Sequence, residues 1–356
     1  LKDPSGYDDT SLARILKNGA EDLPLPTINA NWGDELNMGD PNVLVSYVKW
    51  VADNYPSDRY MLDFWGHGKG WPGVCLDNGD YLNATELRWA MQSLSGAGIR
   101  LDIVSMDACQ MGQLEIAYEL RHAADYALLS QKDVPLSGWP YDAFLGHLKG
   151  NGTVAEKAGA MVDSYISWGR GGNSAYSLTL ALIDLGAIDE LSLALDAYFA
   201  EAALAVGYFN PEIIAARSAT EKYDGDSQYD LLHLLSNIDS RTGHMRLRAL
   251  SSSVSAAMGD CVIHEGHWTN IMDEPADNAH GLSIWFPDRA PSLEYLNTGF
   301  TRDTSWPDFL SAMSAYFPQP GRKDAYLPVS ASSLDSDDDG LMDSARITVG
   351  VGPVQS

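Results

Sequence analysis

The chain has 356 residues, of which 45% are hydrophobic, and this is enough for one large domain with a substantial core or for two small domains. Its 49 acidic residues outnumber its 23 basic residues and give a formal net charge of −26 at pH 7. Such a charge repels nucleic-acid phosphates and anionic lipids, so we expect no nucleic-acid partner. The sequence has no run of about 18 apolar residues, which predicts no membrane span, and its first ten residues are too polar for a signal peptide.

Two buried strands joined by a helix are predicted in the first third of the chain. Residues 60–65 read as a short apolar strand that ends in a loop where glycines flank His67. Residues 85–94 have helical spacing, and residues 101–108 form a second strand that ends just before Cys109. A βαβ unit places the carboxyl ends of its parallel strands at one edge of the sheet. We therefore expect His67 and Cys109 to lie close together.

The alternation of strands and helices continues downstream. A helix is expected over residues 110–123, a strand over 125–130, a strand over 177–185, a helix over 188–204 and a strand over 281–286. This pattern favours an α/β fold with an open, mostly parallel central sheet covered by helices.

The three cysteines cannot all pair with one another, so at least one thiol is free. Cys75 and Cys261 are interpreted as small buried hydrophobic residues. Cys109 and His67 instead form a candidate nucleophile and general base, because the thiolate is the attacking species and a nearby imidazole favours it. The amino end of the expected helix after Cys109 would act in the same direction. The N–H groups of Gly68 and Cys109 form a candidate oxyanion hole, typically worth about a hundredfold in rate.

The same motifs resemble the clostripain family of clan CD cysteine peptidases. The resemblance is carried by WGHGKGW, VCLDNGDYL, MDACQMGQLEIAYELRHAADY and SGWPYDAF, and it extends from Asn37 to the segment that begins at Gly281. It implies a caspase-like α/β/α sandwich, a dyad of His67 and Cys109, and a secreted or cell-surface prokaryotic endopeptidase. The substrates implied are peptides or proteins cut after a basic residue, with no cofactor for catalysis.

Asp107 precedes Cys109 by two residues, so in an extended strand both side chains face the same way, about 6 to 7 Å apart. At an effective dielectric of about 20 the two charges would repel by about 2.5 kcal/mol, which raises the thiol pKa by more than one unit. A cationic substrate side chain would offset this repulsion, and the resemblance gives Asp107 the role of binding that side chain. The alternative is that Asp107 only accepts backbone hydrogen bonds at the strand end.

Other residues of the expected substrate pocket are less well determined. Trp65 is a candidate pocket wall. In the family, acidic residues follow the serine of the third strand, whereas Gln131 and Lys132 stand there in this chain. Asp133 or Asp142 would then supply a second carboxylate, and the choice between arginine and lysine stays open.

The last part of the chain contains an acidic motif that resembles the calcium loops of thrombospondin type 3 repeats. Its aspartates have the spacing that wraps oxygens around Ca²⁺, and calcium favours an extracellular setting. The ligands expected are Asp335, Asp337, Asp339 and Asp343. The alternative is a solvated acidic linker. The domains predicted are a peptidase domain over 1–318, a linker over 319–333 and a calcium-binding tail over 334–356.

Two other interpretations compete with the peptidase. One is a catalytically idle, calcium-dependent binding or adhesion module on the same scaffold. The other is a zinc site at His264, Glu265 and His267, but HEGH is one residue short of the HExxH motif.

Family members are often cut between the histidine and cysteine motifs into two associated chains. No basic residue lies between Lys69 and Arg88, so a peptidase specific for arginine or lysine should leave this loop intact. We expect one band on a denaturing gel for both the wild type and the Cys109→Ala variant. Two wild-type fragments that meet between these residues, and that are missing from Cys109→Ala, would contradict this expectation.

Overall fold

The computed structural model describes residues 10–223, 227–317, 329–334 and 344–349, the last two segments as backbone. It divides into two compact units, residues 1–315 and 316–356. In the second unit, β12 (Val329–Leu334) pairs antiparallel with β13 (Ser344–Val349). The four aspartates of the predicted calcium loop fall between these strands in the sequence, outside the described residues. Calcium binding there therefore stays a prediction.

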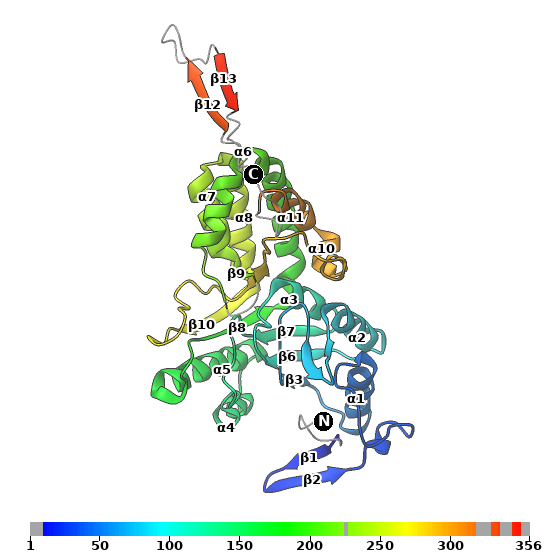
Figure 1. Ribbon diagram of the computed structural model, residues 1–356. Coiled ribbons are helices and arrows are strands. Elements are labelled where there is room, and N and C mark those ends of the chain that lie inside the picture. Colours follow the sequence, from blue (N-terminus) through cyan, green and yellow to red (C-terminus); the bar gives the residue numbers. More distant parts are fainter. Residues whose placement is uncertain (1–9, 224–226, 318–328, 335–343, 350–356) are drawn as a thin grey trace, which may run out of the picture. The chain divides into compact units, whose positions relative to one another are not determined.

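A five-stranded sheet forms the centre of the first unit, with the strand order β10-β8-β7-β6-β3 (Figure 1). Its strands are β3 (Met61–Trp65), β6 (Leu101–Asp107), β7 (Ala124–Leu129), β8 (Leu178–Asp184) and β10 (Val262–Trp268). β3, β6 and β7 are parallel, and β8 is antiparallel to both of its neighbours. Because only β8 runs against the other four, the expected mostly parallel sheet is confirmed.

Burial along the strands follows their positions in the sheet. β6 lies inside the sheet and is buried along nearly all of its length, as its apolar sequence predicts. β3 is an edge strand, and its side chains alternate between buried Leu62 and Phe64 on one face and the more exposed Met61, Asp63 and Trp65 on the other. The more exposed face of β3 therefore continues the face of β6 that carries Asp107.

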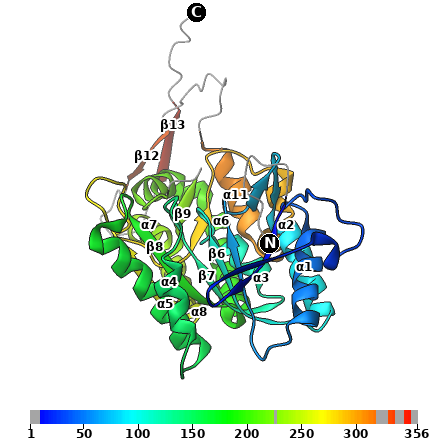
Figure 2. The ribbon, with the colours of Figure 1, turned by 90° about the horizontal axis from the view of Figure 1, so that it is seen from below.

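Helices cover both faces of the sheet. On the face that bears Ile103 and Leu180, α5 (Val154–Trp168) packs Met161, Val162 and Tyr165 into a hydrophobic core. In Figure 1, α4 (Tyr141–Phe144) and α5 lie below the sheet, and α3 (Leu114–Leu120) and α8 (Met245–Cys261) lie above it. Figure 2 shows α5 and α1 (Pro41–Asn54) to either side of the central strands.

The helix between β3 and β6 is α2 (Ala84–Gly96), close to the range expected from the sequence. Asn83 caps it, accepting hydrogen bonds from the N–H groups of Thr85 and Glu86, and the Glu86 carboxylate accepts from the N–H of Asn83. This capping box satisfies donors that the first turn would otherwise leave unpaired.

A second layer of helices is built around α6 (Ile188–Ala219), which is longer than the helix expected over 188–204. It is packed by α7 (Leu231–Thr242), α8 and α11 (Trp306–Ser314). By length and composition alone the segment Leu185–Ala219 would also suit a membrane span, but 44% of the apolar window tested is buried inside the protein. The strand expected over 281–286 is β11 (Ser283–Trp285), which pairs with β9 (Gln228–Asp230) and not with the central sheet.

Smaller elements complete the first unit. They are β1 (Leu12–Leu16), β2 (Gly19–Leu23), β4 (Val74–Asp77), β5 (Asp80–Leu82), α9 (Leu293–Leu296), α10 (Gly299–Asp303) and the short helical turns Leu25–Thr27, Leu145–Leu148, Gly169–Asn173 and Leu185–Ala187.

A buried carboxyl group on α3 should make stability depend on pH. Glu119 is fully buried, accepts a hydrogen bond from the N–H of Gly299 at 2.5 Å and lies 3.6 Å from the Arg88 guanidinium. Burial raises the pKa of Glu119 to about 7. The folded protein therefore holds a proton on Glu119 that the unfolded chain has lost, so stability falls as the pH rises from about 5 through 7.

Glu119→Gln removes this proton linkage. Its free energy of unfolding relative to the wild type should rise by about 2 to 3 kcal/mol between pH 5 and pH 8. Urea denaturation at several pH values measures this difference. Glu294→Gln, which changes an exposed glutamate, is the matched control and should follow the wild type. A Glu119→Gln curve parallel to that of the wild type would contradict the assignment.

Candidate active site

His67 and Cys109 lie beyond the carboxyl ends of two neighbouring parallel strands. The register of β3 and β6 runs from Met61↔Ile103 to Trp65↔Asp107, so each candidate residue comes two positions after the last pair. The N–H of Gly66 donates to the carbonyl of Asp107 at 3.3 Å and extends the contact toward them. The structure thus places both residues at one edge of the sheet, as the sequence indicated.

The backbones of the two motifs touch at Gly68, the residue after His67. A Cβ atom at Gly68 would lie 2.5 Å from the carbonyl oxygen of Cys109 and 2.9 Å from Sδ of Met111. These separations are shorter than van der Waals contact, so only glycine allows this approach.

The N–H of Gly68 donates no hydrogen bond to Val74, the residue opposite it in the hairpin. Gly68 faces Val74 in an antiparallel bridge, and the hydrogen bonds on either side join Cys75 N–H to His67 O at 2.9 Å and Lys69 N–H to Gly73 O at 3.0 Å. Along an antiparallel ladder, hydrogen-bonded pairs alternate with pairs that exchange no hydrogen bonds, and Gly68 and Val74 form a pair of the second kind. Gly68 is therefore able to donate to a substrate oxygen.

The segment after Cys109 is a loop, and the helix expected over 110–123 is confined to α3, Leu114–Leu120. Gln110 has a left-handed φ of 64°, its N–H donates to Lys132 O at 3.1 Å, and the N–H of Gly112 donates to Ser130 O at 2.7 Å. These bonds to the loop after β7 replace a helical first turn. The expected effect of a helix amino end on the Cys109 thiol is therefore wrong. The thiol instead donates to the carbonyl of Val134 at 3.8 Å.

Asp107 is buried, with 3% of its surface exposed. One carboxylate oxygen, Oδ2, accepts from the N–H of Trp139 and from the hydroxyl of Tyr141, both at 2.9 Å. The other, Oδ1, is also buried and has no hydrogen-bond partner among the residues that the structure describes. Burial raises the pKa of Asp107, and the two hydrogen bonds partly oppose this. A buried acceptor without a donor is rare in folded proteins and indicates a missing partner.

A second unpartnered atom lies near Asp107. The hydroxyl of Tyr165, on the buried face of α5, has no hydrogen-bond partner within the described part of the chain. Burial raises the pKa of Tyr165, and the charges of Asp107 and Cys109 raise it further, which places the phenol near both.

The indole of Trp65 also lies near Asp107. A Cβ at Gly138 would lie 2.5 Å from Oδ2 of Asp107 and 2.9 Å from Nε1 of Trp65. The indole is half exposed, as a wall of a substrate pocket would be.

Asp63 belongs to the same cluster and was missed by sequence reasoning. Its Oδ2 accepts from the Tyr141 hydroxyl at 2.6 Å, and its Oδ1 accepts from Ser105 Oγ. Loss of hydration raises the pKa of Asp63 to about 6, with a smaller contribution from the charge of Asp107. The signal was present in the sequence, since Asp63 is the one charged residue in the apolar strand YMLDFW and shares a strand face with Trp65.

In the loop after β7, the polar side chains contact other residues of the protein. Lys132 is buried and lies 3.9 Å from the carboxylate of Asp273, while Gln131 donates to Asp230 at 3.1 Å. Asp133 accepts from the side-chain amide of Gln110 at 2.8 Å, so its predicted contact with substrate stays a prediction.

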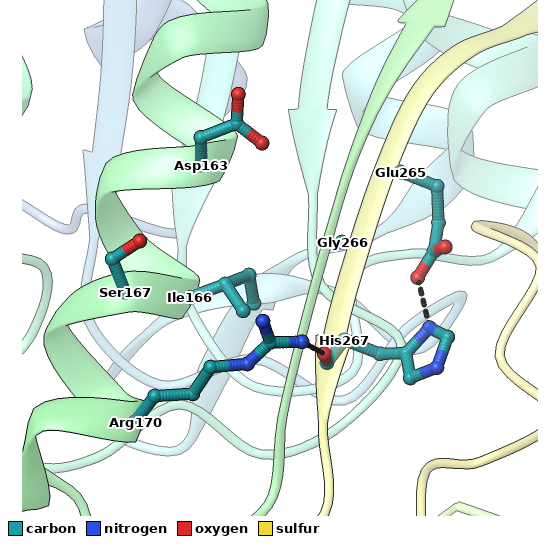
Figure 3. Close-up of a pocket in the computed structure, with 7 residues that line it drawn as sticks. All are labelled: Asp163, Ile166, Ser167, Arg170, Glu265, Gly266 and His267. Atoms are coloured by element: carbon teal, nitrogen blue, oxygen red, sulfur yellow. Dashed lines mark hydrogen bonds and ion pairs between the residues drawn. The ribbon is translucent and has the colours of Figure 1, made fainter.

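The HEGH segment lies at the opposite edge of the sheet, on β10. There a hollow of about 340 Å³ is lined by Asp163, Ile166, Ser167, Arg170, Glu265, Gly266 and His267 (Figure 3). His267 binds Glu265 at 2.9 Å, whereas His264 pairs with Asp163. The described residues contain no group of three side chains that could hold a metal ion.

Comparisons with known proteins find a matching family and a relative. The model of the clostripain family matches residues 7–313. Clostripain of Hathewaya histolytica is 28% identical over 169 residues, which are 41% of this chain and 32% of that protein. The aligned part thus spans about a third of that relative.

Two solved structures share the fold. An inactive zymogen C11 protease from Parabacteroides distasonis is 17% identical, with a TM-score of 0.61 and 83% of each chain covered. A secreted C11 cysteine protease from Bacteroides thetaiotaomicron, solved with an irreversible peptide inhibitor, is 19% identical, with a TM-score of 0.60 over 86% of this chain and 85% of that chain. The expected caspase-like α/β/α fold is confirmed.

Gly68→Ala should disable the site without a change of charge. The added methyl group would overlap the Cys109 carbonyl, so the histidine loop must move and the candidate oxyanion donor moves with it. We expect the rate of peptide cleavage to fall by about a hundredfold or more. Gly33→Ala, where a methyl group meets open space, is the control. Activity of folded Gly68→Ala within threefold of the control would show that this close approach is not needed.

Proposed function

We propose that this chain, which belongs to the clostripain family of cysteine peptidases, is a secreted endopeptidase that cleaves after basic residues through Cys109 and His67. The parallel register of β3 and β6 carries this proposal. It brings a thiol, an imidazole and a glycine N–H to one edge of the sheet, which is the set of groups that acyl transfer requires.

In the proposed reaction, Sγ of Cys109 attacks the carbonyl carbon of the scissile peptide bond, and His67 takes up the thiol proton. The carbonyl oxygen becomes an oxyanion that accepts hydrogen bonds from the N–H groups of Gly68 and Cys109. The C–N bond then breaks as His67 gives its proton to the leaving amine. Water hydrolyses the remaining thioester with His67 as the base and restores the thiol.

Specificity for a basic side chain is supported by the unpaired charge of Asp107. Neither an ion pair nor a partner for Oδ1 is found for this carboxylate among the described residues. A buried carboxylate without a cation is destabilised by several kcal/mol. The ammonium or guanidinium of a substrate would supply both the charge and the donor. Lys132 does not compete, since its own charge is paired with Asp273.

An extracellular location is supported by the Bacteroides relative, which is described as secreted. The net charge of −26 agrees with a soluble enzyme that attracts cationic peptides. The predicted calcium loop at Asp335 would also suit a medium in which Ca²⁺ is abundant.

Fluorogenic peptides that end in Arg, Lys, Asp or Asn before the reporter test the function. We expect turnover after Arg or Lys in the wild type and none in Cys109→Ala. Asp107→Asn should lower kcat/KM for the basic peptides by about a hundredfold, because it removes a buried charge-assisted contact. If the folded Cys109→Ala variant still cleaves the peptides, Cys109 is not the nucleophile. Turnover after Asp alone would keep the nucleophile but refute the role of Asp107.

A further inference from the structure

We propose that Asp63 is a second specificity-determining carboxylate, placed near Asp107 and one step farther from Cys109 along the sheet, and that with Asp107 it selects arginine over lysine. This inference rests on the proposed function, because it concerns the same substrate side chain. It starts from the two carboxylates that share the hydroxyl of Tyr141.

The sheet register determines how far along the strands each carboxylate lies from Cys109. Asp107 pairs with Trp65, and Asp63 pairs with Ser105, two residues earlier on both strands. Residues two apart in a strand face the same way and are separated by about 6.6 Å along it. Asp107 therefore lies one such step below Cys109, and Asp63 lies one step below Asp107 on the neighbouring strand. A long side chain that runs from Cys109 along this face of the sheet meets Asp107 first and the more exposed Asp63 one step farther on.

The Tyr141 hydroxyl links the two carboxylates. Its oxygen is 2.6 Å from Oδ2 of Asp63 and 2.9 Å from Oδ2 of Asp107. A phenol has only one proton to donate, so at any moment the Tyr141 hydroxyl serves only one of the two carboxylates, and Oδ2 of Asp107 keeps the N–H of Trp139 as a second donor. Oδ1 of Asp107 lacks a partner as well. Oδ1 of Asp107 and, whenever Tyr141 donates to Asp107, Oδ2 of Asp63 are therefore short of a hydrogen-bond donor.

The two carboxylates also lack a cationic partner among the described residues. Neither Asp63 nor Asp107 forms an ion pair with any lysine, arginine or histidine that the structure describes. The groups that face Asp63 are Ser105, Tyr141, Asp107 and Cys75, none of which is a cation. Two adjacent carboxylates repel each other, and a bound cation would relieve that repulsion.

A guanidinium fits this pocket better than an ammonium does. It presents five N–H donors in a planar fork and can serve two carboxylates at once, whereas an ammonium is a compact point charge with three donors. Bidentate pairs with carboxylates are also the stronger charge-assisted hydrogen bonds. The arginine head would bind Asp107 with one side and Asp63 with the other, while a lysine head would bind Asp107 and leave Asp63 unsatisfied.

The first experiment measures kcat/KM for two fluorogenic peptides that differ only in arginine or lysine before the reporter. The wild type should prefer arginine. In Asp63→Asn, the value for the arginine peptide should fall by about ten- to hundredfold, and that for the lysine peptide by less than about threefold. Asp58→Asn, an exposed aspartate close in the chain, is the control and should keep the wild-type ratio.

A second measurement uses only the wild type, so it stands even if Asp63→Asn does not fold. Butylguanidine and butylamine compete with the same peptide for the pocket and differ only in the cationic head. We expect the guanidine to inhibit at a concentration at least about tenfold lower than the amine.

The outcomes separate this inference from the function on which it rests. A wild type that cleaves after neither arginine nor lysine refutes the proposed function, and the inference with it. Turnover after both residues with equal losses in Asp63→Asn shows a structural role for Asp63 and overturns the inference alone. A wild-type preference for lysine, or equal inhibition by the two competitors, also overturns it.

Discussion

Parallel hydrogen bonding between β3 and β6 is the constraint on which the rest of the site depends. The register of these two strands includes the pair Trp65↔Asp107. This pair determines which residues of β3 and β6 lie side by side before and after it. His67 and Cys109 come above this pair, and Asp63 lies below it. A shift by one residue would turn the set to the opposite face of the sheet. The positions of Cys109, His67, Asp107 and Asp63 therefore share one geometric origin.

The close approach of the two strand ends requires unusual backbone at several positions. Gly68 has no side chain to separate its backbone from the Cys109 carbonyl. Gln110 adopts a left-handed φ and turns the chain toward the loop after β7, where Lys132 and Ser130 accept its hydrogen bonds and those of Gly112. Such conformations persist only when the surrounding structure holds them. Here the buried loop of Gln131 and Lys132 provides that support.

In the proposed function, electrostatics couple Cys109 to a basic substrate. Asp107 lies on the strand that carries Cys109, and it is buried with an oxygen that lacks a partner among the described residues. The charges of Asp107 and Cys109 both raise the pKa of the buried Tyr165, so the three side chains lie around one space. A cation in this space would stabilise Asp107 and reduce its repulsion of the thiolate. In the proposed function, binding of a basic side chain and activation of Cys109 thus favour each other.

The sequence by itself determined the order of strands and helices around the site and indicated His67 and Cys109 as the candidate dyad. These depend on local patterns, namely apolar runs, the glycines around His67 and the connection of two parallel strands by one helix. The sequence also pointed to Asp107, because a spacing of two along a strand is independent of the remainder of the fold.

Only the tertiary structure decided the start of α3 at Leu114, the pairing of β11 with β9, and the place of Asp63 beside Asp107. Gln110 to Gly112 have a helical pattern, but hydrogen bonds to a loop about 20 residues away outweigh that local preference. Asp63 and Tyr141 are 78 residues apart, so no spacing within one element relates them. Contacts across strands and loops depend on register and packing, and these are properties of the assembled sheet.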